Sequence, residues 1–182
     1  SEYKKINKTI LRNINNTIKK GNIFFGDQIN SFEKKFTKKY NSKYGVAVGS
    51  GTDALTISLL ALNLSKNDEV ITAANTAIPT ISAIIAAGAK PRLVDIGNDY
   101  LIDHTKIKKL INKNTKVIIP VHLYGQPCNM KKISKIAKKF NLKIIEDCAQ
   151  AQNAQIDKKF VGTFGEFGCF SFYPTKILGT YG

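Results

Sequence analysis

The first 43 residues carry apolar positions at helical spacing. One amphipathic helix is predicted by a stripe that stops before Gly21, and a second by aromatic residues that share one face. The stripe residues are Ile6, Ile10, Leu11, Ile14 and Ile18, and the aromatic residues are Phe32, Phe36 and Tyr40. We expect residues 1–43 to form an N-terminal helical arm outside the main sheet.

From residue 44 the pattern changes to short apolar runs that alternate with helical patterns. This alternation is typical of βαβ crossovers, and it predicts an α/β fold with a mostly parallel sheet between two helical layers. The runs are 44–48, 69–73, 91–96, 116–121 and 143–147, the helical patterns are 52–63, 76–87, 103–112 and 129–140, and a hairpin-like stretch precedes a last run at 168–173. We expect 44–182 to form one large domain, truncated at its C-terminal end because the chain stops in a glycine-punctuated turn.

The composition argues against a membrane or secreted protein and against disulfides or a metal site. The 182 residues are 43% hydrophobic, which is enough for a sizeable core, and no run of eighteen apolar residues or signal-peptide core is present. We therefore expect a soluble, cytoplasmic protein with no membrane partner. Cys128, Cys148 and Cys169 are widely spaced without a CxxC pair, so buried reduced thiols are expected in place of disulfides, and no metal site is predicted.

The chain is strongly basic, with a formal net charge of +15. Such a charge raises the possibility of nucleic-acid binding, which would be steeply salt-dependent. However, Arg12 and Arg92 are the only arginines, and arginine is the residue suited to bidentate phosphate and base contacts. The lysines share helices such as 129–140 with apolar stripes, so we interpret them as solvated faces and expect no nucleic-acid partner.

The segment GSGTDAL at 49–55 follows an apolar run and leads into a helical pattern. Glycines let backbone approach an anion, Ser50 and Thr52 add hydroxyls, and a helix N-terminus offers free N–H groups. The segment thus outlines a phosphate cradle. A plain strand-to-helix turn, capped by Thr52 or Asp53, explains it equally well.

Two further candidates lie near strand ends. Glu146 and Asp147 end the run 143–147, and alternation directs them to opposite sides of the sheet. Ligands of open α/β sheets bind beyond the carboxyl ends of strands, so one acid should face a site, unless Asp147 merely caps a helix. Lys176 follows the aromatic run FSFYP on a loop, away from other lysines.

Together these pieces match the needs of pyridoxal phosphate: an anion cradle for the phosphate, a carboxylate for the pyridine nitrogen and an amine for the aldehyde. From about Phe24 to the last residue the chain also resembles the DegT/DnrJ/EryC/StrS sugar aminotransferases, which have the aspartate-aminotransferase fold (fold type I). The segments that carry the resemblance are GSGTDAL, DEVITAANT, PVHLYGQPCNM, IIEDCAQA and SFYPTKILG.

The resemblance implies that the cofactor is pyridoxal 5′-phosphate and that Lys176 is the catalytic lysine that forms a Schiff base with it. Asp147 would hold the pyridine nitrogen protonated, and Gln150 would hydrogen-bond the ring hydroxyl. The remaining cofactor contacts implied by the family are phosphate binding by Gly51, Thr52 and Ser171, and packing of Ala149 against one ring face.

Three positions depart from the family pattern. Ala77 stands where relatives often place an aromatic residue over the ring, so His122 or Tyr124 becomes a candidate for stacking or substrate contact, with a core histidine bonded to backbone as the alternative. Gln152 and Asn153 replace a His-Gly pair. A lysine at 176 speaks against the dehydratase branch of the family, which carries a histidine there.

The implied reaction is transfer of an amino group, from glutamate, to a keto carbon of a nucleotide-diphosphate hexose. The segment 75–80 is similar to members that act on dTDP-3-keto-6-deoxyhexoses. A homodimer and a C-terminal small domain, absent from this chain, are also implied. The alternative is a non-catalytic or regulatory relative that binds the cofactor.

Overall fold

The computed structural model describes residues 2–21 and 26–180, which form two compact units, 1–47 and 48–182. The first unit contains α1 (Glu2–Lys19) and α2 (Asp27–Tyr40). Phe36 stacks on Tyr40 with ring centroids 4.4 Å apart. Asn41 ends α2 in the left-handed region, at φ 51°, a conformation that asparagine tolerates well. Both helices predicted for the arm are therefore present.

The second unit is built on a five-stranded parallel sheet with strand order β2-β1-β3-β4-β7. This confirms the predicted α/β class. The strands are β1 (Glu69–Ala73), β2 (Lys90–Val94), β3 (Thr115–Ile119), β4 (Lys143–Asp147) and β7 (Phe167–Cys169). The hairpin-like stretch forms the antiparallel pair β5 (Gln155–Ile156) and β6 (Lys159–Phe160).

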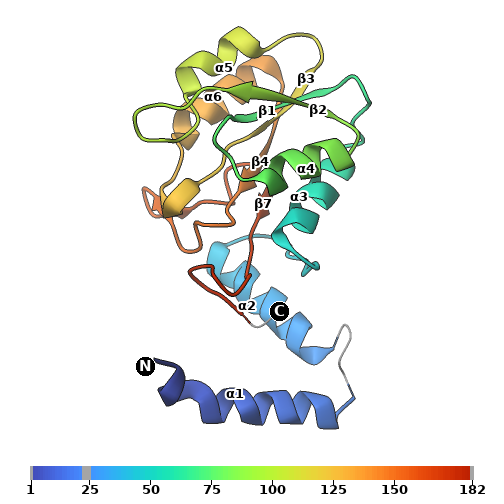
Figure 1. Ribbon diagram of the computed structural model, residues 1–182, viewed down its shortest axis with the longest axis vertical. Coiled ribbons are helices and arrows are strands. Elements are labelled where there is room, and N and C mark those ends of the chain that lie inside the picture. The colour runs from blue at the N-terminus through green and yellow to red at the C-terminus, as the bar shows by residue number, and fades with distance from the viewer. Residues whose placement is uncertain (1, 22–25, 181–182) are drawn as a thin grey trace. The chain divides into compact units, whose positions relative to one another are not determined.

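The order of the strands fixes the side of each helix. From β1 the chain moves outward to β2, then crosses back over β1 to β3 and on to β4. Right-handed crossovers in opposite directions place α4 on one face and α5 and α6 on the other, as Figure 1 shows. The helices are α3 (Gly51–Leu60), α4 (Ile78–Ala86), α5 (His104–Leu110) and α6 (Met130–Phe140), and α3 packs beside α4.

The predicted strand at 44–48 is wrong: these residues adopt no regular structure. A strand needs a partner for its N–H and C=O groups, and none of the described strands pairs with this segment. Its alternating apolar side chains are correspondingly open, with Tyr44 74% and Val46 80% exposed.

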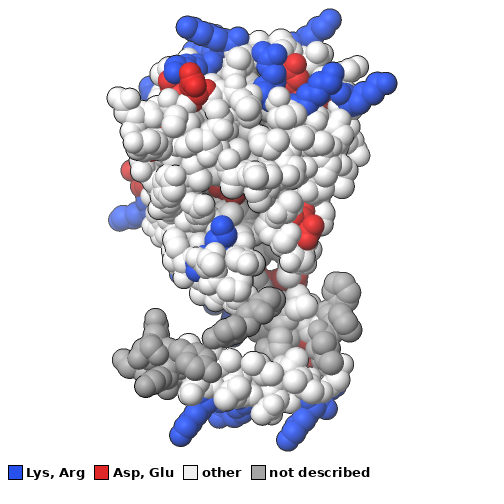
Figure 2. Space-filling view, viewed as in Figure 1, with Lys and Arg blue, Asp and Glu red and all other residues white. Residues whose placement is uncertain are grey.

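The two helical faces of the sheet differ in character. On α5 and α6 lysines cover the outer side, and in Figure 2 blue side chains gather toward the end that carries α5. Asp53 is the one charged residue of α3 and α4, and large apolar side chains of these helices lie open: Ile57, Leu60, Ile78 and Ile85. The outer side of α3 and α4 is therefore apolar where that of α5 and α6 is basic. No helix among the described residues is long and apolar enough to cross a membrane.

Candidate functional site

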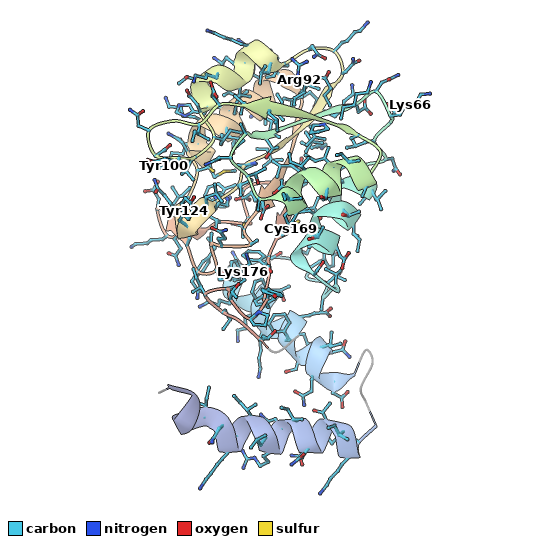
Figure 3. All side chains as sticks on the ribbon, viewed as in Figure 1. Lys66, Arg92, Tyr100, Tyr124, Cys169 and Lys176 are labelled. Carbon is cyan, nitrogen blue, oxygen red and sulfur yellow. The ribbon has the colours of Figure 1, made fainter. Side chains whose placement is uncertain are left out.

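The candidate residues converge on the edge of the sheet where the parallel strands end. Ala77 follows β1, His122 and Tyr124 follow β3, Asp147 closes β4, and Ser171 follows β7. Figure 3 shows Tyr124, Cys169 and Lys176 toward this edge, whereas Arg92 and Lys66 lie toward the opposite one. This is the edge at which open α/β sheets bind ligands.

Asp147 is a buried carboxylate held by two hydrogen bonds. Its Oδ2 accepts from the Thr80 hydroxyl at 2.8 Å, and its Oδ1 accepts from the Ala149 N–H at 3.1 Å. Burial raises the pKa of Asp147, and the hydrogen bonds from Ala149 and Thr80, with the charge of Lys176, offset part of that rise. Each oxygen keeps a second lone pair. Such a group is suited to receive a cationic N–H, which would stabilise its charged form.

Gly51 and Ser171 come together although they are far apart in the sequence. A Cβ built on Gly51 would lie 2.9 Å from Ser171 Cβ, closer than real carbon atoms approach. Ser50 caps α3: its Oγ accepts from the Asp53 N–H at 3.0 Å and donates to Asp53 Oδ2 at 2.9 Å. Ser50, and not Thr52 or Asp53, is therefore the cap. The first N–H groups of a helix have no partner within it, so those of Gly51 and Thr52, which lie at the start of α3 beside Ser171, are suited to an anion such as a phosphate.

The close approach gives a prediction at Gly51. Alanine in a helix is ordinarily favoured over glycine by about 1 kcal/mol, yet Gly51→Ala should lower the free energy of unfolding by about 1–3 kcal/mol because of overpacking against Ser171. Denaturant titration measures it. Adding Ser171→Gly should restore much of the loss by removing the clashing Cβ. A stabilised Gly51→Ala protein would show that the two segments are not in contact.

Gln150 links the loop after β4 to the turn after β3. Its Oε1 accepts from the Tyr124 N–H at 2.8 Å, in a turn where Tyr124 has the left-handed φ of 58°. This bond fixes the side-chain amide, so its NH₂ group is the end left to donate to a ligand. Ala149, half-buried beside it, directs its own N–H to Asp147.

His122 and Glu146 form a buried pair on the other side of β4. His122 Nδ1 accepts from the Cys128 N–H at 3.0 Å, and Nε2 lies 3.1 Å from Glu146 Oε2. Both ring nitrogens are used and the ring is 0% exposed. The structure thus supports the alternative of a core histidine over a stacking role, while Ala77 and Tyr124 are both exposed.

His122, Glu146 and Cys148 have ligand atoms within 4.8 Å of one another, a spacing that would suit a metal ion. Hydrogen bonds already occupy His122 and Glu146, because Glu146 also accepts from the backbone N–H groups of Gly162, Phe164 and Gly165. Burial raises the pKa of the Cys148 thiol well above its usual value, which disfavours the thiolate that a metal needs. We interpret the cluster as structural.

All three cysteines are free and buried, as the sequence predicts. Burial raises the pKa of Cys128 and of Cys169 to about 12. Thiols of this kind are poor nucleophiles, so they add no chemistry to the site.

Lys176 lies half-buried in a tight loop after β7. Its N–H donates to the Tyr173 carbonyl at 2.8 Å, and the Thr180 N–H donates to the Phe172 carbonyl at 2.8 Å. These bonds close the loop. The positive charge of Lys176 is one of the influences that lower the pKa of Asp147.

Sequence reasoning assigned no role to two further groups of this site. Thr80 is fully buried and binds Asp147. Gln152 donates from Nε2 to the Ser171 and Ala149 carbonyls and so ties the cradle to the carboxylate loop, while its buried Oε1 has no hydrogen-bond partner among the described residues. The signal for Thr80 was its hydroxyl within the mostly apolar pattern of α4, although Ser82 in the same helix gives a similar signal.

Comparison with known proteins agrees with this geometry. The dTDP-3-amino-3,4,6-trideoxy-alpha-D-glucose transaminase of Micromonospora megalomicea subsp. nigra is 38% identical over 182 residues, which cover 100% of this chain and 49% of that protein. The UDP-N-acetyl-3-dehydro-alpha-D-glucosamine 3-aminotransferase of Acidithiobacillus ferrooxidans is 42% identical over 95% of this chain and 47% of its own length. The chain thus spans about half the length of these relatives.

A solved structure gives the same answer for the fold. The crystal structure of DesV from S. venezuelae matches with a TM-score of 0.96 at 33% identity, covering 100% of this chain and 49% of that one. The model of the DegT/DnrJ/EryC1/StrS aminotransferase family matches residues 4–182. The chain therefore belongs to the DegT/DnrJ/EryC1/StrS aminotransferase family.

Proposed function

We propose that the whole protein is a pyridoxal-phosphate-dependent aminotransferase that acts on a nucleotide-linked keto sugar. The observation that carries this proposal is the convergence of Asp147, the Gly51–Ser171 cradle and Lys176 at one sheet edge. The cradle fits a phosphate, the carboxylate fits a ring nitrogen, and the amine fits an aldehyde. When bound, pyridoxal phosphate supplies an electron sink for the substrate carbanion.

The residues of the chain then have distinct tasks. Asp147 would accept the ring N–H and keep that nitrogen protonated, and Gln150 would orient the ring through its hydroxyl. Gly51, Thr52 and Ser171 would hold the phosphate, and Ala149 would lie against the ring. Lys176 would anchor the cofactor covalently, and its Nζ, once free, would serve as the general acid and base.

For the substrate we propose a dTDP-linked 3-keto-6-deoxyhexose, with glutamate as the amino donor. Support comes from the segment 75–80 and from the dTDP-sugar transaminase among the relatives. The UDP-sugar relative makes the uridine nucleotide the second candidate to assay. We also propose a homodimer, for which the open apolar side chains of α3 and α4 offer contact area.

The decisive experiment uses the full-length protein. Loaded with pyridoxal phosphate, it should show a visible or near-ultraviolet absorbance band that glutamate converts and a dTDP-keto sugar restores, with an aminated sugar in the product. A regulatory relative would bind the cofactor but show no conversion by any amino donor. Sedimentation of the same sample measures whether it is a dimer.

A further inference from the structure

Thr80 donates its hydroxyl hydrogen to the carboxylate that we assign to the cofactor ring. It lies in the first turn of α4, is 0% exposed, and its Oγ1 is 2.8 Å from Asp147 Oδ2. The Thr76 hydroxyl, four residues earlier, lies 2.7 Å from Thr80 Oγ1. The two threonines therefore form a short series of hydrogen bonds that ends on Asp147.

The number of hydroxyl hydrogens determines which group donates in each of these hydrogen bonds. An ionised carboxylate can only accept, so Thr80 must spend its single hydrogen on Asp147. The contact between the threonines then requires Thr76 to donate to Thr80. Hydrogen bonds in series polarise one another, which makes Thr80 a stronger donor to the carboxylate than an isolated hydroxyl.

Few of the groups around Asp147 stabilise its ionised form, so the hydrogen bond from Thr80 matters. The chain neighbours of Asp147 are Glu146 on β4 and Cys148 just after that strand, and its partner on β7 is Cys169. None of these side chains carries a positive charge that would favour an anion. Lys176 carries a positive charge that favours ionised Asp147, whereas His122 contributes none, because its Nδ1 accepts a hydrogen bond and the ring is therefore neutral. Helix α4 has no charged residue. From the α4 side, ionised Asp147 is therefore stabilised by the Thr80 hydroxyl.

We propose that Thr80, supported by Thr76, is a positioning residue that keeps Asp147 ionised and correctly oriented for the pyridine nitrogen. This rests on the proposed function. Thr80 acts through Asp147 and is not itself in contact with the reacting atoms. Burial disfavours the charged form of Asp147, and the Thr80 hydroxyl offsets part of that cost. Without the hydroxyl, the carboxylate would take up a proton at higher pH.

Three substitutions in the full-length protein separate the hydroxyl from its methyl group. Thr80→Val keeps the shape and removes the donor, Thr80→Ser keeps the donor, and Thr76→Val removes only the support. Thr76 is half-buried, so its change should leave the core folded. The measurements are the affinity for pyridoxal phosphate across pH, and the titration midpoint of Asp147 in cofactor-free protein by carboxyl ¹³C NMR, assigned with Asp147→Asn.

Thr80→Val should weaken cofactor affinity near neutral pH by roughly tenfold to a hundredfold, the range for a hydrogen bond to a charged group. It should also move the Asp147 midpoint upward. Thr76→Val should shift both in the same direction by less, and Thr80→Ser should stay close to wild type.

Unchanged affinity and midpoint in Thr80→Val would overturn the proposal, as would a Thr80→Ser protein that loses as much as Thr80→Val, since packing would then be the cause. If the wild-type protein binds no pyridoxal phosphate, the proposed function fails, and the midpoint in cofactor-free protein still decides whether Thr80 controls Asp147.

Discussion

Lys176→Ala should abolish covalent retention of pyridoxal phosphate and reduce amino transfer by roughly 10²–10⁴-fold, the range for losing a positioned acid-base group. Borohydride reduction followed by mass spectrometry tests the covalent bond at Lys176, and single-turnover absorbance measures the transfer of the amino group from glutamate. The reason is that alanine leaves no amine at the position to which we assign the Schiff base.

Two variants make the Lys176 test specific. Lys176→Arg keeps a positive charge near Asp147 but cannot form the Schiff base or exchange a proton near neutral pH; it should bind cofactor without trapping it. Lys135→Ala removes an exposed lysine of α6 and should leave both assays at wild-type levels. Borohydride labelling that persists in Lys176→Ala would assign the covalent role to another residue and remove the central support of the proposed function.

The parts of the site that sequence could predict are those fixed by chain direction. Alternation along β4 predicted opposite directions for Glu146 and Asp147, and the structure shows Glu146 bound to His122 and Asp147 bound to Thr80. Parallel strands end at one edge, so the carboxylate at the end of β4 and the lysine loop after β7 had to lie near each other. The direction of the strands alone is enough for this prediction, without knowledge of any contact between distant residues.

What sequence could not predict depends on packing between distant segments. The bond from Thr80 to Asp147 arises because the first turn of α4 reaches the carboxyl end of β4, a placement that neither segment encodes alone. The strand expected at 44–48 has the right alternation but no partner among the described strands, so its local preference is not realised. Capping by Ser50 was missed for a local reason: Ser50, Thr52 and Asp53 lie within four residues, and the side chain of each suits the capping position.

Glu146→Ala should lower the free energy of unfolding by about 3–5 kcal/mol, the range for breaking a buried charged network. The side chain is 0% exposed and binds four groups. Oε1 accepts from the Phe164 and Gly165 N–H groups, and Oε2 accepts from the Gly162 N–H and lies beside His122 Nε2. Removing the carboxylate leaves these donors buried without partners, a cost that Ala cannot recover.

Glu166→Ala is the matched control, because Glu166 also binds backbone, accepting from the Ile144 N–H at 2.7 Å, but its side chain is 37% exposed. Water can replace that bond, so the loss should stay near 1 kcal/mol. Denaturant titration of both variants in cofactor-free protein isolates stability from catalysis. Equal losses would mean that the buried pair adds nothing beyond an ordinary surface bond. A much larger loss at Glu146 would establish it as the group that holds the 162–165 loop and the turn after β3 against β4, behind the cofactor carboxylate.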